Sequence, residues 1–357
     1  MPSSISVKSS VGVYEILTDT TISSVLKSLP EGKAAYLVDE KIIKYHQHSL
    51  AEFIDFERVY PISATEENKS LENLIAIYKS LIDGGFKRDH HLVAIGGGII
   101  QDITCFIAST IFRGVDWFFL PTTLLAQADS CMGSKSSINI GGSKNLLGTF
   151  YPPKAVLIAT EFLETLTVSE IKSGVGEMLK AHAIDSASSF DQITCDYAEM
   201  FKDREVLHKW TLSSLLIKKP YVEIDEFDKG IRNIFNYGHS FGHAIEAATN
   251  FEIPHGIAVS MGMDFANFVS VNFSLIDESH YLRMRPVLQS NYYEYCGTRI
   301  PFDAFFSALS KDKKNTTEDF VFILPVGDNA EIQKRSISKK SPIEAICRSF
   351  LPGEINK

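Results

Sequence analysis

The stretch HHLVAIGGGIIQD, residues 90–102, decides the fold of the first half of the chain. It begins with a short apolar run of strand length, turns on three glycines and continues into a helical pattern. Glycines in such a turn let backbone N–H groups approach a phosphate, and the N-terminus of the helix favours its negative charge. Because the segment lacks the G-x-G-x-x-G fingerprint, it indicates a standard Rossmann fold only weakly, and a plain tight turn is the alternative.

Segments on both sides of this stretch extend an α/β pattern. The runs AAYLVDE (34–40), VDWFFLPTT (115–123) and the start of KAVLIATEFLETL (154–166) are typical of buried strands. The segment SLENLIAIYKSLIDGG (70–85) has apolar residues at three-to-four spacing and ends on glycines, which predicts an amphipathic helix. Strands that alternate with helices in this way predict parallel βαβ units.

The sequence changes character near residue 166. Beyond it, segments with helical spacing predominate, such as TVSEIKSGVGEMLKAHAI (167–184), and only VFILPVG (321–327) is strand-like. A length of 357 residues also suits two domains. We therefore predict an α/β domain of residues 1–166, a mainly α-helical domain of residues 167–357, and a functional cleft between them.

The composition is that of an ordinary soluble globular protein, with 45% hydrophobic and 22% charged residues, and we expect a cytoplasmic enzyme. The net charge of −9 argues against broad nucleic-acid binding, although it allows a small basic pocket for an anionic metabolite. The absence of a signal-length or membrane-length apolar segment predicts no membrane association. The five cysteines are scattered without a C-x-x-C pair, which predicts free thiols.

The segment FNYGHSFGHAIE (235–246) places two histidines four residues apart on one face of a predicted helix, His239 and His243. Together with His255 and Glu177 they provide the ingredients of a mixed histidine and carboxylate metal site. Such a pair of histidines is also common as simple decoration of a surface or core, so this motif alone leaves both interpretations open.

Two charged segments are candidates for binding an anion. ADSCMGSKSSINIGGSKNLLG (128–148) carries lysines among glycines and serines, which suits a phosphate or carboxylate ligand. KKPYVEIDEFDKGIRNIFN (218–236) is rich in both charges. The alternatives are a solvated surface loop for the first segment and an exposed charged helix and turn for the second.

Taken together, these motifs resemble one family, the dehydroquinate synthases, which are sugar phosphate cyclases. The resemblance covers roughly residues 30–330, and it is specific because several charged motifs occur in the family's order and spacing. The motifs are GGGIIQD (96–102), RG (113–114), PTTLLAQADS (121–130), GSK (133–135), SKNLLGTFYPP (143–153), GEMLK (176–180), DEFDKGIRNIFNYGHSFGHAIE (225–246) and HGIAVSMGM (255–263).

The resemblance implies a Rossmann-like N-terminal domain that binds NAD, a helical C-terminal domain that binds a metal, and a homodimer. Its implied ligands for Zn2+, or Co2+ in its place, are Glu177, His239 and His255. In this assignment His243 is not a metal ligand, although its spacing from His239 suggests that the two histidines bind the metal together. It instead faces the substrate. The implied NAD-binding residues are Asp39, Glu66, Lys69, Gly98, Ile99, Ile100, Gln101, Asp102, Thr122, Thr123, Lys144, Phe162, Leu163, Glu164 and Thr165.

The resemblance also implies a set of residues around an anionic sugar phosphate. They are Asp129, Lys135, Asn145, Lys180, Lys218, Arg232, Asn236, His243 and one lysine of the DKK motif, for which Lys313 is the first candidate and Lys314 the alternative. Arg113 matches an arginine that reaches the site of the neighbouring subunit. The chain departs from the family pattern at Gln101 and Ser134, which stand where glycines are usual, and in NIGGSKN (139–145), which leaves room for a specialised paralogue.

The implied reaction converts 3-deoxy-D-arabino-heptulosonate 7-phosphate into 3-dehydroquinate and phosphate, a step of the shikimate pathway to the aromatic amino acids. It proceeds by transient oxidation with NAD, elimination of phosphate, re-reduction and an intramolecular aldol reaction. The alternatives are a cyclase of sedoheptulose 7-phosphate or glucose 6-phosphate, a metal-dependent polyol dehydrogenase, and a binding relative without activity. Lys218, Arg232 and Asn236 favour the first reaction, because the other cyclases tend to replace them and use substrates without a carboxylate.

Overall fold

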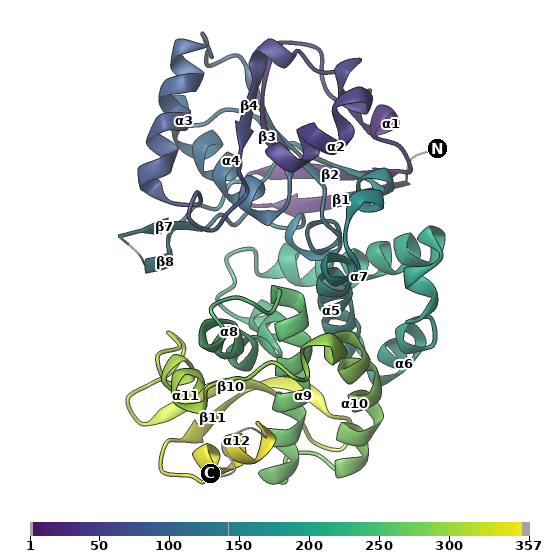
Figure 1. The fold of residues 1–357 in the computed structure, drawn as a ribbon, viewed down its shortest axis with the longest axis vertical. Coiled ribbons are helices and arrows are strands. Elements are labelled where there is room, and N and C mark those ends of the chain that lie inside the picture. The colour runs from purple at the N-terminus through teal and green to yellow at the C-terminus, as the bar shows by residue number, and fades with distance from the viewer. Residues whose placement is uncertain (1–2, 142, 352–357) are drawn as a thin grey trace. The chain divides into compact units, whose positions relative to one another are not determined.

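The computed structural model describes residues 3–141 and 143–351, which pack into two compact units (Figure 1). The first unit contains the chain up to residue 167 together with residues 218–227, and the second contains residues 168–217 and the chain from residue 228 onward. The predicted domain boundary after residue 166 stays a prediction. Packing differs from that single boundary in one respect, since residues 218–227 belong with the first unit.

The first unit is built on a seven-stranded sheet, with the strand order β1-β2-β9-β6-β5-β3-β4. All neighbouring strands are parallel except β1 and β2, which form an antiparallel hairpin at one edge. The strands are β1 (Ser3–Ser9), β2 (Gly12–Asp19), β3 (Ala34–Asp39), β4 (Val59–Ile62), β5 (His91–Gly96), β6 (Trp117–Pro121) and β9 (Ala155–Ala159). A separate antiparallel pair consists of β7 (Ile138–Ile140) and β8 (Ser143–Leu147).

Helices cover both faces of this sheet, which explains why β5 and β6 are buried at every position. Val93 and Ile95 of β5 share a core with residues of α1 and α2. Helix α4, which contributes no residue to that core, also packs against β5 and β6. Successive strand residues point to opposite faces, so an apolar run without alternation is what a sheet covered on both sides requires. The helices are α1 (Ile22–Leu26), α2 (Glu40–Ala51), α3 (Leu71–Asp83) and α4 (Gly98–Thr110).

The strand order reverses between β3 and β5. From β3 the chain passes outward to β4, and it then returns to β5 on the other side of β3 and continues to β6 and β9. In open α/β sheets, ligands bind at the carboxyl ends of the strands beside such a reversal. The acidic Asp39 ends β3, and the three-glycine turn begins at Gly96, the last residue of β5, so both predicted cofactor segments lie at this position in the topology.

The second unit is mainly helical. Helix α7 contributes its residues up to 217 to this unit and its remainder to the first. The helices are α5 (Val168–Asp185), α6 (Ala187–Cys195), α7 (Arg204–Ile224), α8 (His239–Ala248), α9 (His255–Asn272), α10 (Glu278–Tyr292), α11 (Phe302–Ser310) and α12 (Ile343–Phe350). A hairpin of β10 (Asp319–Val326) and β11 (Glu331–Ser338) accompanies them.

The predicted fold class, an α/β N-terminal part and a mainly helical C-terminal part, is confirmed. The prediction of a single strand in the helical half was wrong, because β11 pairs with β10 along its whole length. Strand β11 is largely exposed and polar, so it has no apolar run that could reveal it. Among the described residues, no helix combines the length and the apolar character needed to cross a membrane.

Candidate active site

A cluster of one carboxylate and three histidines lies within the second unit. Glu177 Oε1 is 3.7 Å from His239 Nε2 and 3.3 Å from His255 Nε2. His239, His243 and His255 offer nitrogen atoms that all lie within 4.8 Å of one another. The structure therefore brings together every residue that the sequence proposed for a metal site, although Glu177 and His255 are far apart in the chain.

A glycine turn before α8 and a close contact between α5 and α9 create this cluster. Helix α8 begins at His239, directly after Gly238, whose φ of 76° turns the chain into the helix. Helix α9 begins at His255 and approaches α5 so closely that a Cβ atom on Gly256 would lie 1.7 Å from the carbonyl oxygen of Ser173. This approach allows Glu177, which lies in the middle of α5, to reach the first residue of α9.

Glu177 is almost completely buried, at 2% exposure, which is unusual for a carboxylate without a full set of partners. Lys180 forms an ion pair with it, yet neither carboxylate oxygen has a regular hydrogen bond. Burial raises the pKa of Glu177, but Lys180, His239 and His255 outweigh that effect and hold the pKa well below its usual range. The carboxylate is therefore charged and has spare acceptor capacity.

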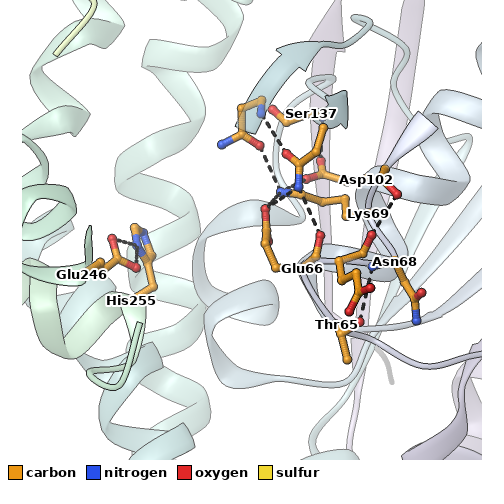
Figure 2. Close-up of polar contacts among 12 residues, drawn as sticks. Thr65, Glu66, Asn68, Lys69, Asp102, Ser137, Glu246 and His255 are labelled. Carbon is orange, nitrogen blue, oxygen red and sulfur yellow. Dashed lines mark hydrogen bonds and ion pairs between the residues drawn. The ribbon is translucent and has the colours of Figure 1, made fainter. Parts of the chain in front are cut away.

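His255 has a second carboxylate behind it, and this residue was missed by the sequence analysis. Its Nδ1 atom is 3.2 Å from Glu246 Oε1, so the two side chains lie against each other (Figure 2). Desolvation lowers the pKa of His255, but the neighbouring carboxylates of Glu177 and Glu246 outweigh it and raise the pKa to about 10. An acceptor at Nδ1 fixes the ring so that Nε2 points toward Glu177, as is usual for histidine ligands of metals.

The substrate-facing role predicted for His243 is compatible with its position one turn after His239. Its ring centroid is 5.3 Å from that of His239 and 5.6 Å from that of His255. Desolvation lowers the pKa of His243 to about 4, and the positive charges of His255 and Lys314 act in the same direction. Part of the His243 side chain nevertheless remains exposed to solvent. Lys313 is exposed, so Lys314 is a second candidate for the lysine near the substrate.

The first unit contains a separate polar cluster around Lys69. Its ammonium group is 3.3 Å from Asp102 Oδ2, 3.0 Å from Asn145 Oδ1 and 3.4 Å from Glu66 Oε1 (Figure 2). Desolvation raises the pKa of Asp102 to about 6, against the opposing effect of Lys69. The cluster joins three predicted cofactor residues to Asn145, which was predicted to contact substrate.

Two residues that the sequence analysis missed complete this cluster. The backbone N–H of Ser137 donates to Asp102 Oδ1 at 3.0 Å (Figure 2). Asn139 donates to Glu66 Oε1 at 2.9 Å and accepts from the backbone N–H of Asn145 at 2.8 Å. Hydrogen bonds therefore tie Ser137, Asn139 and Asn145 of the lysine- and glycine-rich segment to this cluster.

The glycine turn after β5 has room for a ligand at one position only. A Cβ atom on Gly96 would lie 2.4 Å from Ile100, and one on Gly97 would lie 3.0 Å from Thr123. On Gly98 the nearest atom would be Ser130 Oγ at 3.9 Å, so that position is open. Helix α4 begins at Gly98, and its capping residue, Gly97, has no side chain that could accept a hydrogen bond from the first N–H groups of the helix.

Lys218 lies against the π-helical turn Ala126–Ser130 of the first unit. Its ammonium group donates to the carbonyl oxygen of Asp129 at 2.7 Å and is 3.1 Å from the Asp129 carboxylate. Lys218 is 5% exposed, and Arg232 of the second unit is 7% exposed. The alternative interpretation of residues 218–236 as an exposed charged segment is therefore wrong for these two side chains.

Other predicted residues are placed by the structure without a test of their roles. Asp39 caps α2 by accepting from the backbone N–H of Lys41 at 3.0 Å. Phe162 is fully buried in the core, and Thr165 lies 3.2 Å from His46 Nε2. Their contact with a cofactor stays a prediction, as do the roles of Thr122, Glu164, Lys144, Lys135, Asn236 and Arg113.

Comparison with known proteins assigns the chain to a family. Residues 59–173 match the 3-dehydroquinate synthase N-terminal family, and residues 174–315 match the 3-dehydroquinate synthase C-terminal family. A 3-dehydroquinate synthase from Clostridium tetani is 34% identical over 352 residues, which cover 94% of this chain and 92% of that protein. One from Campylobacter curvus is 35% identical over 325 residues, which cover 90% and 92%.

The chain belongs to the 3-dehydroquinate synthase family. The predicted resemblance is thereby confirmed, and the matches favour a dehydroquinate synthase over the alternative of another sugar phosphate cyclase or a polyol dehydrogenase.

Solved structures share the fold of this dehydroquinate synthase family member. A 2-deoxy-scyllo-inosose synthase complexed with carbaglucose-6-phosphate, NAD+ and Co2+ superimposes with a TM-score of 0.83 at 22% identity, covering 97% of this chain and 100% of that chain. A 2-epi-5-epi-valiolone synthase from Streptomyces hygroscopicus with NAD+ and Zn2+ bound gives 0.80 at 21% identity, covering 97% and 98%. A probable glycerol dehydrogenase from Sinorhizobium meliloti gives 0.60 at 14%, covering 84% and 89%.

Proposed function

We propose that this chain is a 3-dehydroquinate synthase, which converts 3-deoxy-D-arabino-heptulosonate 7-phosphate into 3-dehydroquinate and phosphate in the shikimate pathway. The observation that carries the proposal is the buried Glu177 beside His239 and His255, in a chain of this family. The enzyme would be a carbon–oxygen lyase, since the reaction eliminates phosphate and returns its cofactor unchanged.

Glu177, His239 and His255 would hold a divalent cation. The fit is supported by the buried carboxylate oxygens without regular hydrogen bonds and by a donor set of one oxygen and two nitrogens, which zinc favours. Three protein ligands leave coordination positions for substrate. Cobalt is the alternative ion, as in the solved 2-deoxy-scyllo-inosose synthase.

The carboxyl ends of β3 and β5 would hold NAD. The open position at Gly98, the uncapped start of α4 and the acidic Asp39 after β3 fit a pyrophosphate and a ribose. When bound, the two groups supply a reversible hydride acceptor and a Lewis acid for the reacting alcohol. The remaining tasks belong to the side chains of the protein.

The cationic side chains would hold the two anionic ends of the substrate. A phosphate and a carboxylate together carry about three negative charges near neutral pH. Lys218 and Arg232 are charged side chains that are almost completely buried, so each is held in a defined position. Asp129 keeps the Lys218 ammonium group in place, while Lys135 and Lys313, or Lys314, would add charge from other segments.

Lys180 would act beside the metal site rather than on the phosphate. It is 2% exposed, pairs with Glu177 and lies 5.7 Å above the ring of Phe235. A cation fixed there keeps the Glu177 carboxylate charged and offers a proton donor near the reacting carbons. The departing phosphate itself would accept the proton that is lost in the elimination, so the proposal assigns no separate base.

The proposed active unit is a homodimer in which Arg113 reaches the site of the neighbouring subunit. Arg113 is exposed and has a φ of 67°, and it follows Phe112 with a φ of 51°. Left-handed backbone costs about 1–2 kcal/mol per non-glycine residue, and such strain gathers at functional positions. This geometry supports a role for Arg113 that the isolated chain does not use.

A phosphate-release assay with three sugar phosphates tests the proposal. We expect turnover of 3-deoxy-D-arabino-heptulosonate 7-phosphate without a net change in the absorbance of NADH at 340 nm. We expect little turnover of sedoheptulose 7-phosphate or glucose 6-phosphate. Arg232→Ala should lose about 2–5 kcal/mol of binding, which is at least roughly 30-fold in kcat/KM, whereas the exposed Arg335→Ala should not. Preferential turnover of another sugar phosphate, or one NADH per turnover, would contradict the proposal.

The metal site is tested separately by direct binding. Glu177→Gln keeps the size of the side chain and removes its charge, so we expect a folded protein that no longer retains zinc after dialysis. Metal content measured by mass spectrometry and far-UV circular dichroism report on these two points. A Glu177→Gln protein with unchanged zinc content and turnover would refute the ligand assignment.

A further inference from the structure

The second unit contains a cavity that the proposed function does not use. Its volume is about 660 Å³, within the range of sites for small ligands. Its walls come from α9, α10, α12 and the segment 295–302, and α9 packs against both other helices (Figure 1). None of the described residues that line it belongs to the predicted metal, cofactor or substrate sites.

The charged groups of this cavity are all positive. Arg285, Arg299 and Arg348 line it from three different segments, and no carboxylate is among its described lining residues. Arg348 is partly compensated by Glu344 at 3.1 Å, and Arg285 lies 3.8 Å from a carboxylate oxygen of Asp264. Both of these guanidinium groups therefore have acidic neighbours outside the cavity.

Arg299 differs from the other two arginines. It is exposed, and within the part of the chain that the structure describes it has no ion pair or hydrogen bond. The whole chain carries a net charge of −9. A cavity whose charged lining residues are all arginines therefore differs in charge from the chain as a whole. An uncompensated guanidinium at the wall of a cavity is suited to an anion with two acceptor oxygens.

Aromatic side chains form a further part of the walls, beside aliphatic and polar ones. Tyr292, Tyr295, Phe302 and Phe350 line the cavity. The Tyr292 hydroxyl donates to Asp264 at 2.6 Å, and the Tyr295 hydroxyl lies 3.0 Å from Ser169 Oγ. Because these hydroxyl groups are engaged elsewhere, the two tyrosine rings present apolar surfaces, which suit an aromatic ligand. One face of Phe302 is covered by the guanidinium of Arg348 at 3.8 Å, and Phe350 stacks on Phe265.

We propose that this cavity binds a small aromatic carboxylate. Its carboxylate pairs with the guanidinium of Arg299, and its ring packs among the aromatic side chains of α10, α11 and α12. Inorganic phosphate satisfies only the charge, and a neutral aromatic amide satisfies only the walls. The two parts of the proposal can therefore be tested with matched probes.

Isothermal titration of the full-length protein with 2-naphthoate measures the binding. We expect 2-naphthoate to bind at least about tenfold more tightly than 2-naphthamide or inorganic phosphate, since each of these lacks one of the two interactions. Arg299→Ala should lose about tenfold in affinity, whereas Arg335→Ala, an exposed arginine on β11 outside the cavity, should lose none. Equal affinity for the acid and the amide, or an unchanged Arg299→Ala variant, would overturn the proposal.

Cysteine labelling locates the bound probe. Cys296 is exposed and lines the cavity, while Cys195 is exposed on α6 outside it. Saturating 2-naphthoate should slow the reaction of Cys296 with N-ethylmaleimide severalfold and leave Cys195 unchanged, as measured by peptide mass spectrometry. Binding without selective protection of Cys296 would place the probe elsewhere and overturn the assignment.

Discussion

At the scale of single residues, Glu246 orients a histidine of the proposed metal site. It holds His255 Nδ1 at 3.2 Å, and this contact decides which ring nitrogen faces Glu177. Outer carboxylates of this kind typically contribute 10–100-fold to metal affinity. The sequence motif contained Glu246, but nothing in its spacing indicates that it meets a histidine on the next helix.

Glu246→Gln should therefore weaken zinc binding without removing it. The amide keeps the shape of the side chain but loses the charge that favours the N–H at Nδ1, so we expect about a 10–100-fold lower affinity. Competition with a fluorescent chelator measures this change, and the exposed Glu252→Gln serves as the control. Equal zinc affinities in Glu246→Gln and Glu252→Gln would contradict the role.

Gln101 occupies a position where the family usually has glycine, and the structure gives it a clear function. Its amide donates to the carbonyl oxygen of Ser130 at 2.7 Å, and its oxygen accepts from Ser130 Oγ at 2.7 Å. Ser130 ends the π-helical turn that holds Asp129, and Asp129 in turn holds Lys218. A π-helical turn is a common device at functional sites, and here a side chain from α4 fixes it.

Gln101→Ala should loosen this turn. Two hydrogen bonds are lost and the half-buried hydroxyl of Ser130 loses its acceptor, so we expect about 1–3 kcal/mol lower unfolding free energy. Less accurate placement of Lys218 should raise the KM for the sugar phosphate more than it lowers kcat. Urea unfolding and steady-state kinetics measure both effects, and Gln192→Ala, which is exposed on α6, should change neither. An unchanged KM would argue against positioning by Gln101.

At the scale of elements, the α5–α9 contact connects packing to the metal site. A Cβ atom on Gly256 would lie 1.7 Å from the Ser173 carbonyl oxygen, and one on Gly176 would lie 2.0 Å from that of Gly256. Backbone atoms cannot move aside as a flexible side chain can. The two helices must therefore separate if either glycine gains a side chain, and Glu177 and His255 would separate with them.

Gly256→Ala is expected to lower both stability and zinc affinity. Alanine stabilises a helix by up to about 1 kcal/mol relative to glycine, but overpacking typically costs about 1–3 kcal/mol. Here the added methyl group would collide with backbone atoms of the neighbouring helix. Gly297→Ala, where no atom lies within 4 Å of the added Cβ, is the matched control. Urea unfolding with and without zinc measures the change; a Gly256→Ala protein as stable as the control would show that the helices adapt at no cost.

The elements that could be predicted from sequence are those with a strong local signal. Buried parallel strands such as β5 read as continuous apolar runs, and α3 has a clear amphipathic period. The β1–β2 hairpin and β11 were not predicted, because their exposed faces carry polar residues and their pairing depends on partners elsewhere in the chain. For the same reason the carboxylate behind His255 became visible only in the folded structure.

At the scale of the whole molecule, the role proposed for Arg113 would require a second copy of the chain. Arg113 stands on a strained turn at the end of α4, where Gly114, with a φ of 120°, donates its N–H to the carbonyl of Ile111 at 3.0 Å. If the arginine serves the neighbouring subunit, the defect of an Arg113→Ala subunit falls on its partner. A defect in Glu177 instead falls on the subunit that carries it.

Mixed dimers separate these two cases. Arg113→Ala and Glu177→Gln subunits, each inactive as a homodimer, are produced together in equal amounts with different affinity tags. In a mixed dimer, the site of the Arg113→Ala subunit has its own Glu177 and receives Arg113 from its partner, so it is complete. Random pairing should restore about one quarter of the wild-type activity in the mixture, and about half in doubly purified mixed dimers. If Arg113 acts within its own subunit, both sites of the mixed dimer are defective and no activity returns.

A chain that stays monomeric in multi-angle light scattering while fully active would exclude sharing of the site altogether.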